Sequence, residues 1–475
     1  MMKRIFFVSI VIALLLLPSC RSSTNCCRPI GAPSSWVSTE SEGEVDLCWW
    51  ESFEDDQLTH YIELASENNK DVRAAMANVC QARAVRLTVT SQLYPDIDAE
   101  LRYNRNSFNT FFGGAGNANP GNIASVTTNF QQEIFFVGLD AIWEIDIFGR
   151  TRKQVEAACY RVGSAVEAYH GALLSVFAET ATNYFNARGY QELIAQKEEK
   201  IKTLEEILDL RKKLETTGIA NSIDILDLEA SLSSLKSELP QLVAEMFTAI
   251  YRLSILIGEF PGVLLEEMEA PKPLPSLPVL VEAGLPSELL ERRPDIRQAE
   301  AELGAATADV GVAVRDLFPR FFLAGSVGHQ KFTLPTQLFD NFVWSYTADI
   351  LTPVFKGGRL RANIRAEEAK AMARFYQYEQ TILQAVEEAE SRIVGYTQEV
   401  DRTSNLESSL SDVSDAFALT EALYLSGIAD APGVLNKKLN VISAKEVVTE
   451  SKLEAFNKLI SLYKSLGGGW DIPCY

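Results

Sequence analysis

The sequence predicts a mixed α and β fold built from two matched halves, each with long helices and two strands. Three observations support this prediction. Apolar residues recur at helical spacing over long tracts, four shorter segments alternate apolar and polar residues, and the order of these elements repeats on either side of a proline-rich connector. With 475 residues, the chain is long enough to bury a large core.

The N-terminus resembles a bacterial lipoprotein signal. A short basic region precedes an apolar run over 6–17, which is shorter than the roughly 20 residues that a membrane-spanning helix needs. The run ends in LPSC, a sequence similar to a lipobox, so residues 1–19 would be removed and lipid attached to Cys20. Arg21 stands where an aspartate would favour inner-membrane retention, which indicates the outer membrane. Residues 20–56 would then form a lipidated tether and an N-terminal segment. An ordinary signal peptide is the alternative.

The first half, 57–270, is predicted to begin with a helix over 60–87, followed by two strands. The strands are expected at about 95–106 and 133–148, because apolar and polar residues alternate there with a period of two. In the first strand the apolar positions are Ile97, Ala99, Leu101 and Tyr103, and in the second they are Val137, Leu139, Ala141, Trp143, Ile145 and Ile147.

Long helices are predicted over 150–257, with a reversal at Gly218. No proline occurs between Arg150 and Leu214, a tract that would span roughly 95 Å as one unbroken helix. Beyond the reversal, leucines at alternating steps of four and three form a heptad seam, which is typical of coiled-coil contact. On periodicity alone, a soluble helical bundle is the better interpretation.

The second half, 287–466, repeats this order after a proline-rich connector at 271–286. It is predicted to begin with a helix over 287–314, and its long helices reverse at Gly427. The other expected elements are strands at about 318–329 and 341–355, long helices over 358–466 and a C-terminal tail over 467–475.

Strand counting favours a membrane barrel shared between chains. Tryptophan and tyrosine on the apolar side are typical of lipid-facing strands, and a barrel in lipid must close to pair its backbone groups. Four strands are too few, since the smallest such barrels have about eight. Three chains would supply about twelve strands, and the same symmetry would assemble the long helices into a helical barrel. The alternative is a periplasmic sheet with one wet face.

Composition excludes several functional classes. Lys and Arg total 44 against 64 Asp and Glu, a formal net charge of −20, which argues against non-specific binding to nucleic acid or anionic headgroups. An acidic duct suits cations or cationic amphiphiles, although acidic soluble proteins are common. The three histidines are far apart and lie in no zinc motif, so no metal or other cofactor is expected.

Cysteine pairing stays open. The chain has seven cysteines, and export would permit disulfides. Lipidation of Cys20 would leave six. A link from Cys26 or Cys27 to Cys48 or Cys474 is possible, but pairing is not readable from spacing.

The segment LPSELLERRPDIRQAE, Leu285 to Glu300, closely resembles the most characteristic motif of the outer membrane factor (TolC-like) family, in particular its OprM-like or NodT-type lipoprotein branch. Residues 145–150, 256–258 and 355–360 also match. The resemblance implies a homotrimer with a twelve-stranded barrel in the outer membrane and a helical tunnel through the periplasm. It implies as partners a periplasmic adaptor (membrane fusion) protein and an inner-membrane pump of the RND or ABC type. Because that pump supplies energy, the channel needs no catalytic residue.

The resemblance also suggests site residues. The family's closed end lies at the periplasmic tips of the helix pairs, here the turns at Gly218 and Gly427, which are expected to contact the adaptor. Asp430, with Asp224 second, is the candidate for a periplasmic gate, where three copies of one carboxylate would favour cations. The alternative is that Asp430 only caps the last helix.

Three functions remain open on the sequence. The first is the exit channel of a tripartite efflux system for small molecules, favoured by the lipobox-like segment and the motif. The second is a type I secretion duct for proteins or peptides. The third is a non-conducting coiled-coil envelope lipoprotein. A secreted enzyme has no support, because the sequence carries no Walker A loop, GxGxxG or GxSxG.

Overall fold

The computed structural model describes residues 31, 33, 35–38, 48–112, 126–216, 221–275, 277, 284–334 and 337–470. The chain divides into two units, Met1–Gly31 and Ala32–Tyr475. The predicted signal peptide, 1–19, and Cys20 lie outside the described residues. The following paragraphs concern the second unit.

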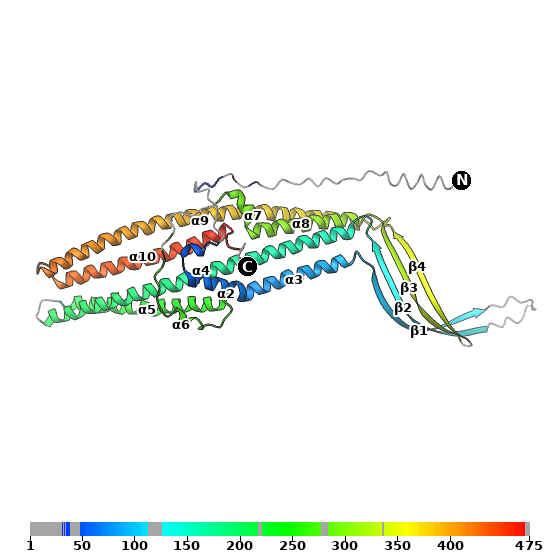
Figure 1. Ribbon diagram of the computed structural model, residues 1–475, viewed down its shortest axis with the longest axis horizontal. Coiled ribbons are helices and arrows are strands. Elements are labelled where there is room, and N and C mark those ends of the chain that lie inside the picture. The colour runs from blue at the N-terminus through cyan, green and yellow to red at the C-terminus, as the bar shows by residue number, and fades with distance from the viewer. Residues whose placement is uncertain are drawn as a thin grey trace, which may run out of the picture. The chain divides into compact units, whose positions relative to one another are not determined.

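The second unit consists of two halves with the same order of elements (Figure 1). The first half contains α3 (Lys70–Ser91), β1 (Asp96–Phe112), β2 (Val126–Ile145), α4 (Arg150–Thr216) and α5 (Ser222–Leu256). The second half contains α8 (Pro294–Arg315), β3 (Arg320–Leu334), β4 (Gln337–Leu351), α9 (Arg359–Leu425) and α10 (Ala431–Ser465). Corresponding helices have equal lengths, with 22 residues in α3 and α8, 67 in α4 and α9, and 35 in α5 and α10. The predicted two-fold repeat is confirmed.

Two helices that the sequence predicts as continuous are interrupted. Asn69 leaves helical geometry at φ −58°, ψ 133°, and its side chain accepts hydrogen bonds from the amides of Asp71 and Val72, so it caps α3. In the second half Pro294 starts α8, because it has no N–H to continue the preceding turn. The shorter elements are η1 (Glu51–Phe53), α2 (Asp56–Asn68), α6 (Leu265–Met268), η2 (Pro286–Glu288) and α7 (Leu289–Arg292).

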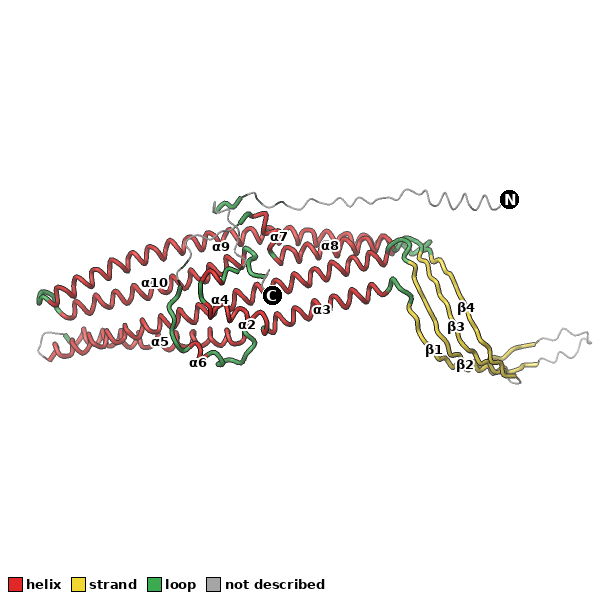
Figure 2. The backbone as a smooth tube through the Cα atoms, viewed as in Figure 1, coloured by secondary structure: helices red, strands yellow, loops and turns green. Residues whose placement is uncertain are grey.

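The four strands form one antiparallel sheet in the order β1-β2-β3-β4 (Figure 2). The sheet continues from the ends of α3, α4, α8 and α9, while the α4–α5 and α9–α10 reversals lie at the opposite end of the helices. At their hairpin ends the strands run beyond the predicted limits, because backbone pairing continues through polar residues that break the alternation, such as Asn106 opposite Gln132.

The other ends of β2 and β4 are shorter than predicted. β4 ends at Leu351 and not near 355, since Pro353 cannot donate to a strand ladder. β2 ends at Ile145 and not near 148, and Gly149 turns the chain into α4 with φ +76°.

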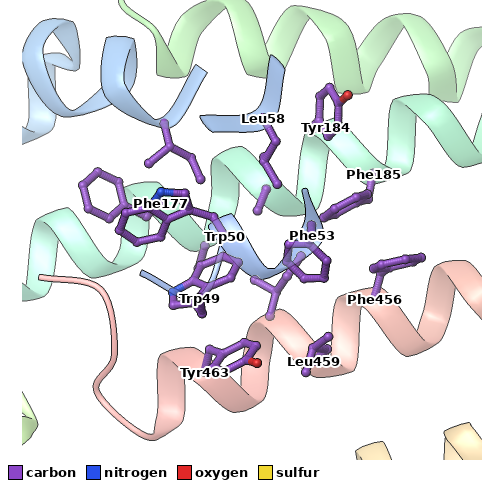
Figure 3. Close-up of a cluster of buried hydrophobic side chains, with 14 of the residues drawn as sticks. Trp49, Trp50, Phe53, Leu58, Phe177, Tyr184, Phe185, Phe456, Leu459 and Tyr463 are labelled. Carbon is purple, nitrogen blue, oxygen red and sulfur yellow. The ribbon is translucent and has the colours of Figure 1, made fainter. Parts of the chain in front are cut away.

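The main core lies where α4 and α10 pack together, and it includes the segment that precedes α2 (Figure 3). Trp49, Trp50 and Phe53 are at most 4% exposed. Trp49 stacks on Tyr463 of α10 at 5.4 Å, and Phe53 meets Phe185 of α4 edge-on at 5.0 Å. The last residues of the predicted tether and N-terminal segment, 20–56, are therefore part of the fold, because these aromatic rings are buried in the core.

The predicted C-terminal tail, 467–475, is anchored at its start. Trp470 donates from its indole N–H to the carbonyl oxygen of Arg292 at 2.8 Å. Its ring stacks on His170 at 4.5 Å, and the Arg297 guanidinium lies 5.0 Å from the ring centroid. Residues 471–475 lie outside the described residues.

Arg293, in the middle of the motif at 285–300, has a structural role. Its guanidinium is buried, donates to the carbonyl oxygen of Ser465 at 2.8 Å, and pairs with Asp295 and Glu388. Burial alone would lower the pKa of this group, but hydrogen bonds to the two carboxylates outweigh it and hold the pKa above its usual value. The residue thereby joins the start of α8 to α9 and to the end of α10.

A second buried charge cluster joins α9 to α10 through Glu399. Its carboxylate accepts from Lys458 at 2.6 Å, from Ser451 at 2.8 Å and from Arg402 at 2.7 Å. Burial opposes ionisation, but these donors prevail and hold the pKa of Glu399 below its usual value.

Replacing Phe53 tests the assignment of the N-terminal segment to the core. Phe53→Ala removes a ring packed against three aromatic rings, those of Trp49, Phe185 and Phe456, so we expect a loss of about 3–5 kcal/mol in the free energy of unfolding. Thermal unfolding of the purified protein measures it. Phe260→Ala is the matched control, because Phe260 is 84% exposed. Equal effects of the two changes would show that 48–56 is not part of the core.

Candidate functional site

One face of the sheet is apolar and exposed across all four strands. The register pairs Leu101 with Val137, Leu139 with Val327 and Val327 with Trp344, so these side chains lie on the same side. Twelve large apolar side chains of this face are between 39% and 80% exposed. The apolar sheet face comprises Ile97, Leu101, Tyr103, Phe135, Val137, Leu139, Leu323, Val327, Phe342, Trp344, Tyr346 and Ile350.

The opposite face of the sheet is predominantly polar. Asp98 lies opposite Asp140, which in turn lies opposite Ser326. Ser326 and Ser345 share a hydrogen bond of 2.8 Å between their hydroxyl groups. This division into an apolar and a polar face is the alternation that the sequence predicts, and it suits a surface between lipid and water.

The strands have the length that a membrane requires. β3 and β4 have 15 residues each, β1 has 17 and β2 has 20, against about 9–11 for a tilted membrane strand. Among the helices of the described ranges, none combines the length and apolar character needed to cross a bilayer.

Two exposed apolar residues just beyond β4 escaped the sequence analysis. Val354 is 93% exposed and Phe355 is 86% exposed. The signal was present, since an apolar pair stands directly before Lys356, two glycines and the long helix α9. Their assignment to the preceding strand concealed it.

The reversal between α9 and α10 contains two of the predicted site residues. Gly427 has φ +74°, and its amide donates to the carbonyl oxygen of Tyr424 at 2.9 Å. A positive φ is the reason for glycine at this reversal. The amide of Ile428 donates to Leu423 at 2.9 Å, so the end of α9 is closed by backbone hydrogen bonds.

Asp430 occupies the N-cap position of α10, but its side chain makes no capping hydrogen bond. It is exposed. A Cβ atom at Gly433 would lie 2.6 Å from its Oδ1 atom, so glycine leaves room for this carboxylate. Asp430 thus stands at the capping position, but its side chain does not make the hydrogen bond of a cap.

The reversal between α4 and α5 is only partly described. Gly218 lies outside the described residues. Asp224 is exposed in the first turn of α5, whose cap is Asn221. The Asn221 side chain accepts from the amide of Ile223 at 3.2 Å. Both candidate gate residues are therefore at the starts of helices, Asp430 as the N-cap of α10 and Asp224 in the first turn of α5, and Figure 1 shows these two helix starts at the same end of the unit.

Within the described ranges, no three His, Cys, Asp or Glu side chains are grouped to hold a metal ion. Cys80 and Cys159 are exposed and are not in disulfides. Cys26, Cys27 and Cys474 lie outside the described residues, so the disulfide hypothesis stays untested.

A family model described as "Outer membrane efflux protein" matches residues 61–259 and 285–468, which are most of the two halves without the connector. The chain belongs to the outer membrane efflux protein family. The resemblance inferred from the motif is thereby confirmed.

Relatives align with this efflux protein over almost its whole length. It is 26% identical to nodulation protein T of Rhizobium leguminosarum bv. viciae, covering 97% of this chain and 92% of the relative. It is 28% identical to the pyoverdine export outer membrane protein OpmQ of Pseudomonas aeruginosa, covering 98% of this chain and 97% of the relative. The solved outer-membrane channel OprN matches with a TM-score of 0.80 and 30% identity, over 93% of this chain and 98% of that one. The efflux protein is thus an outer-membrane protein with a long helical part.

Replacing the two N-cap residues distinguishes their roles. Asn221→Ala removes a capping hydrogen bond worth about 1 kcal/mol, so the amides of the first turn of α5 should exchange with solvent about fivefold faster. Asp430→Ala should change exchange in the first turn of α10 less, because no capping hydrogen bond is lost. Hydrogen exchange followed by mass spectrometry measures both. A larger effect at Asp430 would mean that its side chain does cap α10.

Proposed function

We propose that three copies of this chain form one channel in the outer membrane, which is the exit duct of a tripartite efflux system for small molecules. The observation that carries the proposal is the apolar sheet face, which is exposed on a sheet of four strands with two open edges. The rest of the molecule fits the same assembly.

The open edges argue for several copies. β1 and β4 each have one neighbour in the sheet, so each presents a row of unpaired backbone groups. In lipid such groups cost several kcal/mol each unless they are paired. Pairing of β4 in one copy with β1 in the next removes both edges, and three copies supply about twelve strands, within the range of known barrels.

The helices continue the same assembly beyond the membrane. α4, α5, α9 and α10 pack as two helix pairs, and three copies would surround one tunnel. We place the reversals near Gly218 and Gly427 at its periplasmic end, where a periplasmic adaptor and, through it, an inner-membrane pump would deliver the substrate. The pump would supply the energy, so the chain acts as a duct and not as an enzyme.

The lipid anchor and the domain boundaries expected from the sequence are part of this proposal. Cys20 would carry lipid after removal of 1–19, and the connector at 271–286 would join the two repeats. Small molecules are the favoured substrate class, because the relative OpmQ is named for export of pyoverdine. A secretion duct for proteins has no such support.

Native mass in mild detergent tests the trimer. We expect about three times the mass of one mature chain, where the mature mass is the 52.6 kDa of the full sequence less the signal peptide. We also expect single-channel conductance in planar bilayers. A monomer that remains in solution without detergent would contradict the shared barrel and favour the helical envelope lipoprotein.

Asp430→Asn tests the gate. Asparagine keeps the shape and capping capacity of the residue but removes three carboxylates from the trimer, so the permeability of cations relative to anions should fall roughly twofold or more. Bilayer reversal potentials in a salt gradient measure this ratio. Asp224→Asn tests the second candidate, and Asp401→Asn, an exposed carboxylate in the middle of α9, is the control. Selectivity that is the same in all variants would exclude both gate residues.

A further inference from the structure

An apolar pocket with an acidic rim lies in the groove between α4 and α5, beside α6 (Figure 1). Its volume is about 530 Å³, which is within the range of pockets that bind small molecules. All three helices contribute apolar side chains to it. Among them are Ile194 of α4, Val243, Met246, Phe247 and Ile250 of α5, and Leu265 of α6.

The charged side chains of this pocket are all acidic. Glu198, Glu266 and Glu269 line it, and no lysine, arginine or histidine of the described residues does. The three carboxylates are exposed and take part in no salt bridge within the described ranges. Lys197, the neighbour of Glu198 in sequence, pairs with carboxylates of α5 and α10 instead. The pocket therefore has an acidic rim and no cation of its own.

The wall that α6 contributes is fixed by hydrogen bonds within one chain. Gln191 of α4 donates to the carbonyl oxygen of Met268, and Arg188 donates to that of Ala270 at 2.7 Å. The Arg188 side chain is buried. The pocket is thus preformed, and no second copy of the chain is needed to complete it.

The pocket also lies away from the side of α5 that offers exposed apolar surface. Its lining positions on α5, from Val243 to Ile250, recur at steps of three and four and face α4. Tyr251 and Ile255 are 38% and 48% exposed, and at about 100° per residue they lie roughly 110° further around the helix. A second copy that packs against these two residues approaches α5 from another side.

The second half of the chain supplies a comparison for this groove. Corresponding helices have equal lengths, so Glu198 of α4 matches Glu407 of α9, and Val243 of α5 matches Lys452 of α10. Lys452 pairs with Glu407 at 2.7 Å. The second half therefore neutralises its carboxylate with its own ammonium group, whereas the first half has an apolar residue at that position.

Lys452 indicates what kind of molecule fits the first half. A lysine side chain combines an apolar stem, which lies along neighbouring side chains, with a terminal cation that reaches a carboxylate. A free molecule with the same combination matches both the apolar lining and the rim at Glu198. Phe247 is part of that lining, and an aromatic ring attracts a cation placed over its face.

We propose that the pocket between α4, α5 and α6 binds an organic cation, with its positive charge at the three carboxylates and its apolar body against Val243 and Phe247. An inorganic cation would leave the apolar lining uncovered, and a neutral apolar molecule would leave the carboxylates unmatched. The inference goes beyond the proposed function, because the site is complete in one chain and includes neither the sheet nor the helix reversals.

Fluorescence polarisation of rhodamine 6G, a planar organic cation, tests the site on the full chain in mild detergent, with protein-free micelles as the background. Fluorescein has the same fused ring system with negative charge, and tetramethylammonium chloride supplies a cation without the apolar body. The test variant is Val243→Lys, which introduces the salt bridge of the second half. The control variant is Val447→Lys, which adds the same charge at an exposed position of α10 outside the pocket.

We expect the wild type and the control variant to bind rhodamine 6G at least about tenfold more tightly than fluorescein. Val243→Lys should lose about tenfold in affinity for rhodamine 6G, because the new ammonium group occupies the pocket and pairs with Glu198. Equal binding by Val243→Lys and Val447→Lys would overturn the proposal. Displacement of rhodamine 6G by millimolar tetramethylammonium would overturn it in favour of a simple cation site.

A second pair of variants keeps the test valid if Val243→Lys does not fold, which thermal unfolding would show. Glu198→Gln with Glu266→Gln leaves the apolar lining intact and should weaken rhodamine 6G binding about threefold, since exposed charge pairs contribute modestly. Glu63→Gln with Glu67→Gln, two exposed carboxylates of α2 outside the pocket, is the matched control. The same affinity in both double variants would show that the acidic rim does not recognise the cation.

The oligomeric state and conductance of the same samples separate this inference from the proposed function. A monomer without conductance that binds rhodamine 6G would refute the channel and leave the pocket as a binding site. A conducting trimer that does not bind rhodamine 6G would refute only the binding site, and this includes the case in which a second copy covers the pocket.

Discussion

The architecture depends on the need to pair every backbone N–H and C=O group inside a bilayer. A four-stranded sheet with an exposed apolar face leaves its two outer edges unpaired, so a single chain is an incomplete membrane structure. In the proposed channel, oligomerisation is then a condition of the fold and not an addition to it. The long helices follow from the same condition, because strands that close around one axis bring their attached helices around that axis as well.

The helical part obeys more ordinary rules. Its main core is built from aromatic and aliphatic side chains of α2, α4, α5 and α10, with the segment before α2 inserted among them. Buried charges are retained only where several donors or acceptors surround them, as at Arg293 and Glu399. The family motif around Arg293 therefore serves to join helices at the middle of the unit, which is far in sequence from either reversal.

Sequence reasoning succeeded where a pattern has a period. The alternation in β1 to β4, the proline-free tract of α4 and the repeated order of elements in the second half located the helices and strands. It failed where a short segment carries no period, since nothing in the spacing of Trp49, Trp50 and Phe53 distinguishes core from tether. The sequence also could not predict the role of Asp430, because a gate depends on distances between copies of the chain.

The order of the sheet has a consequence for how the protein folds. β1 and β2, like β3 and β4, are neighbours in sequence and can pair as local hairpins, but the β2–β3 ladder joins Ile145 to Phe321 across both long helices of the first half and α8. Closing such a long loop is slow, and it must wait until α4 and α8 have packed together. The sheet is therefore completed late, after synthesis of the second half, and the apolar strands stay without their full set of partners until then.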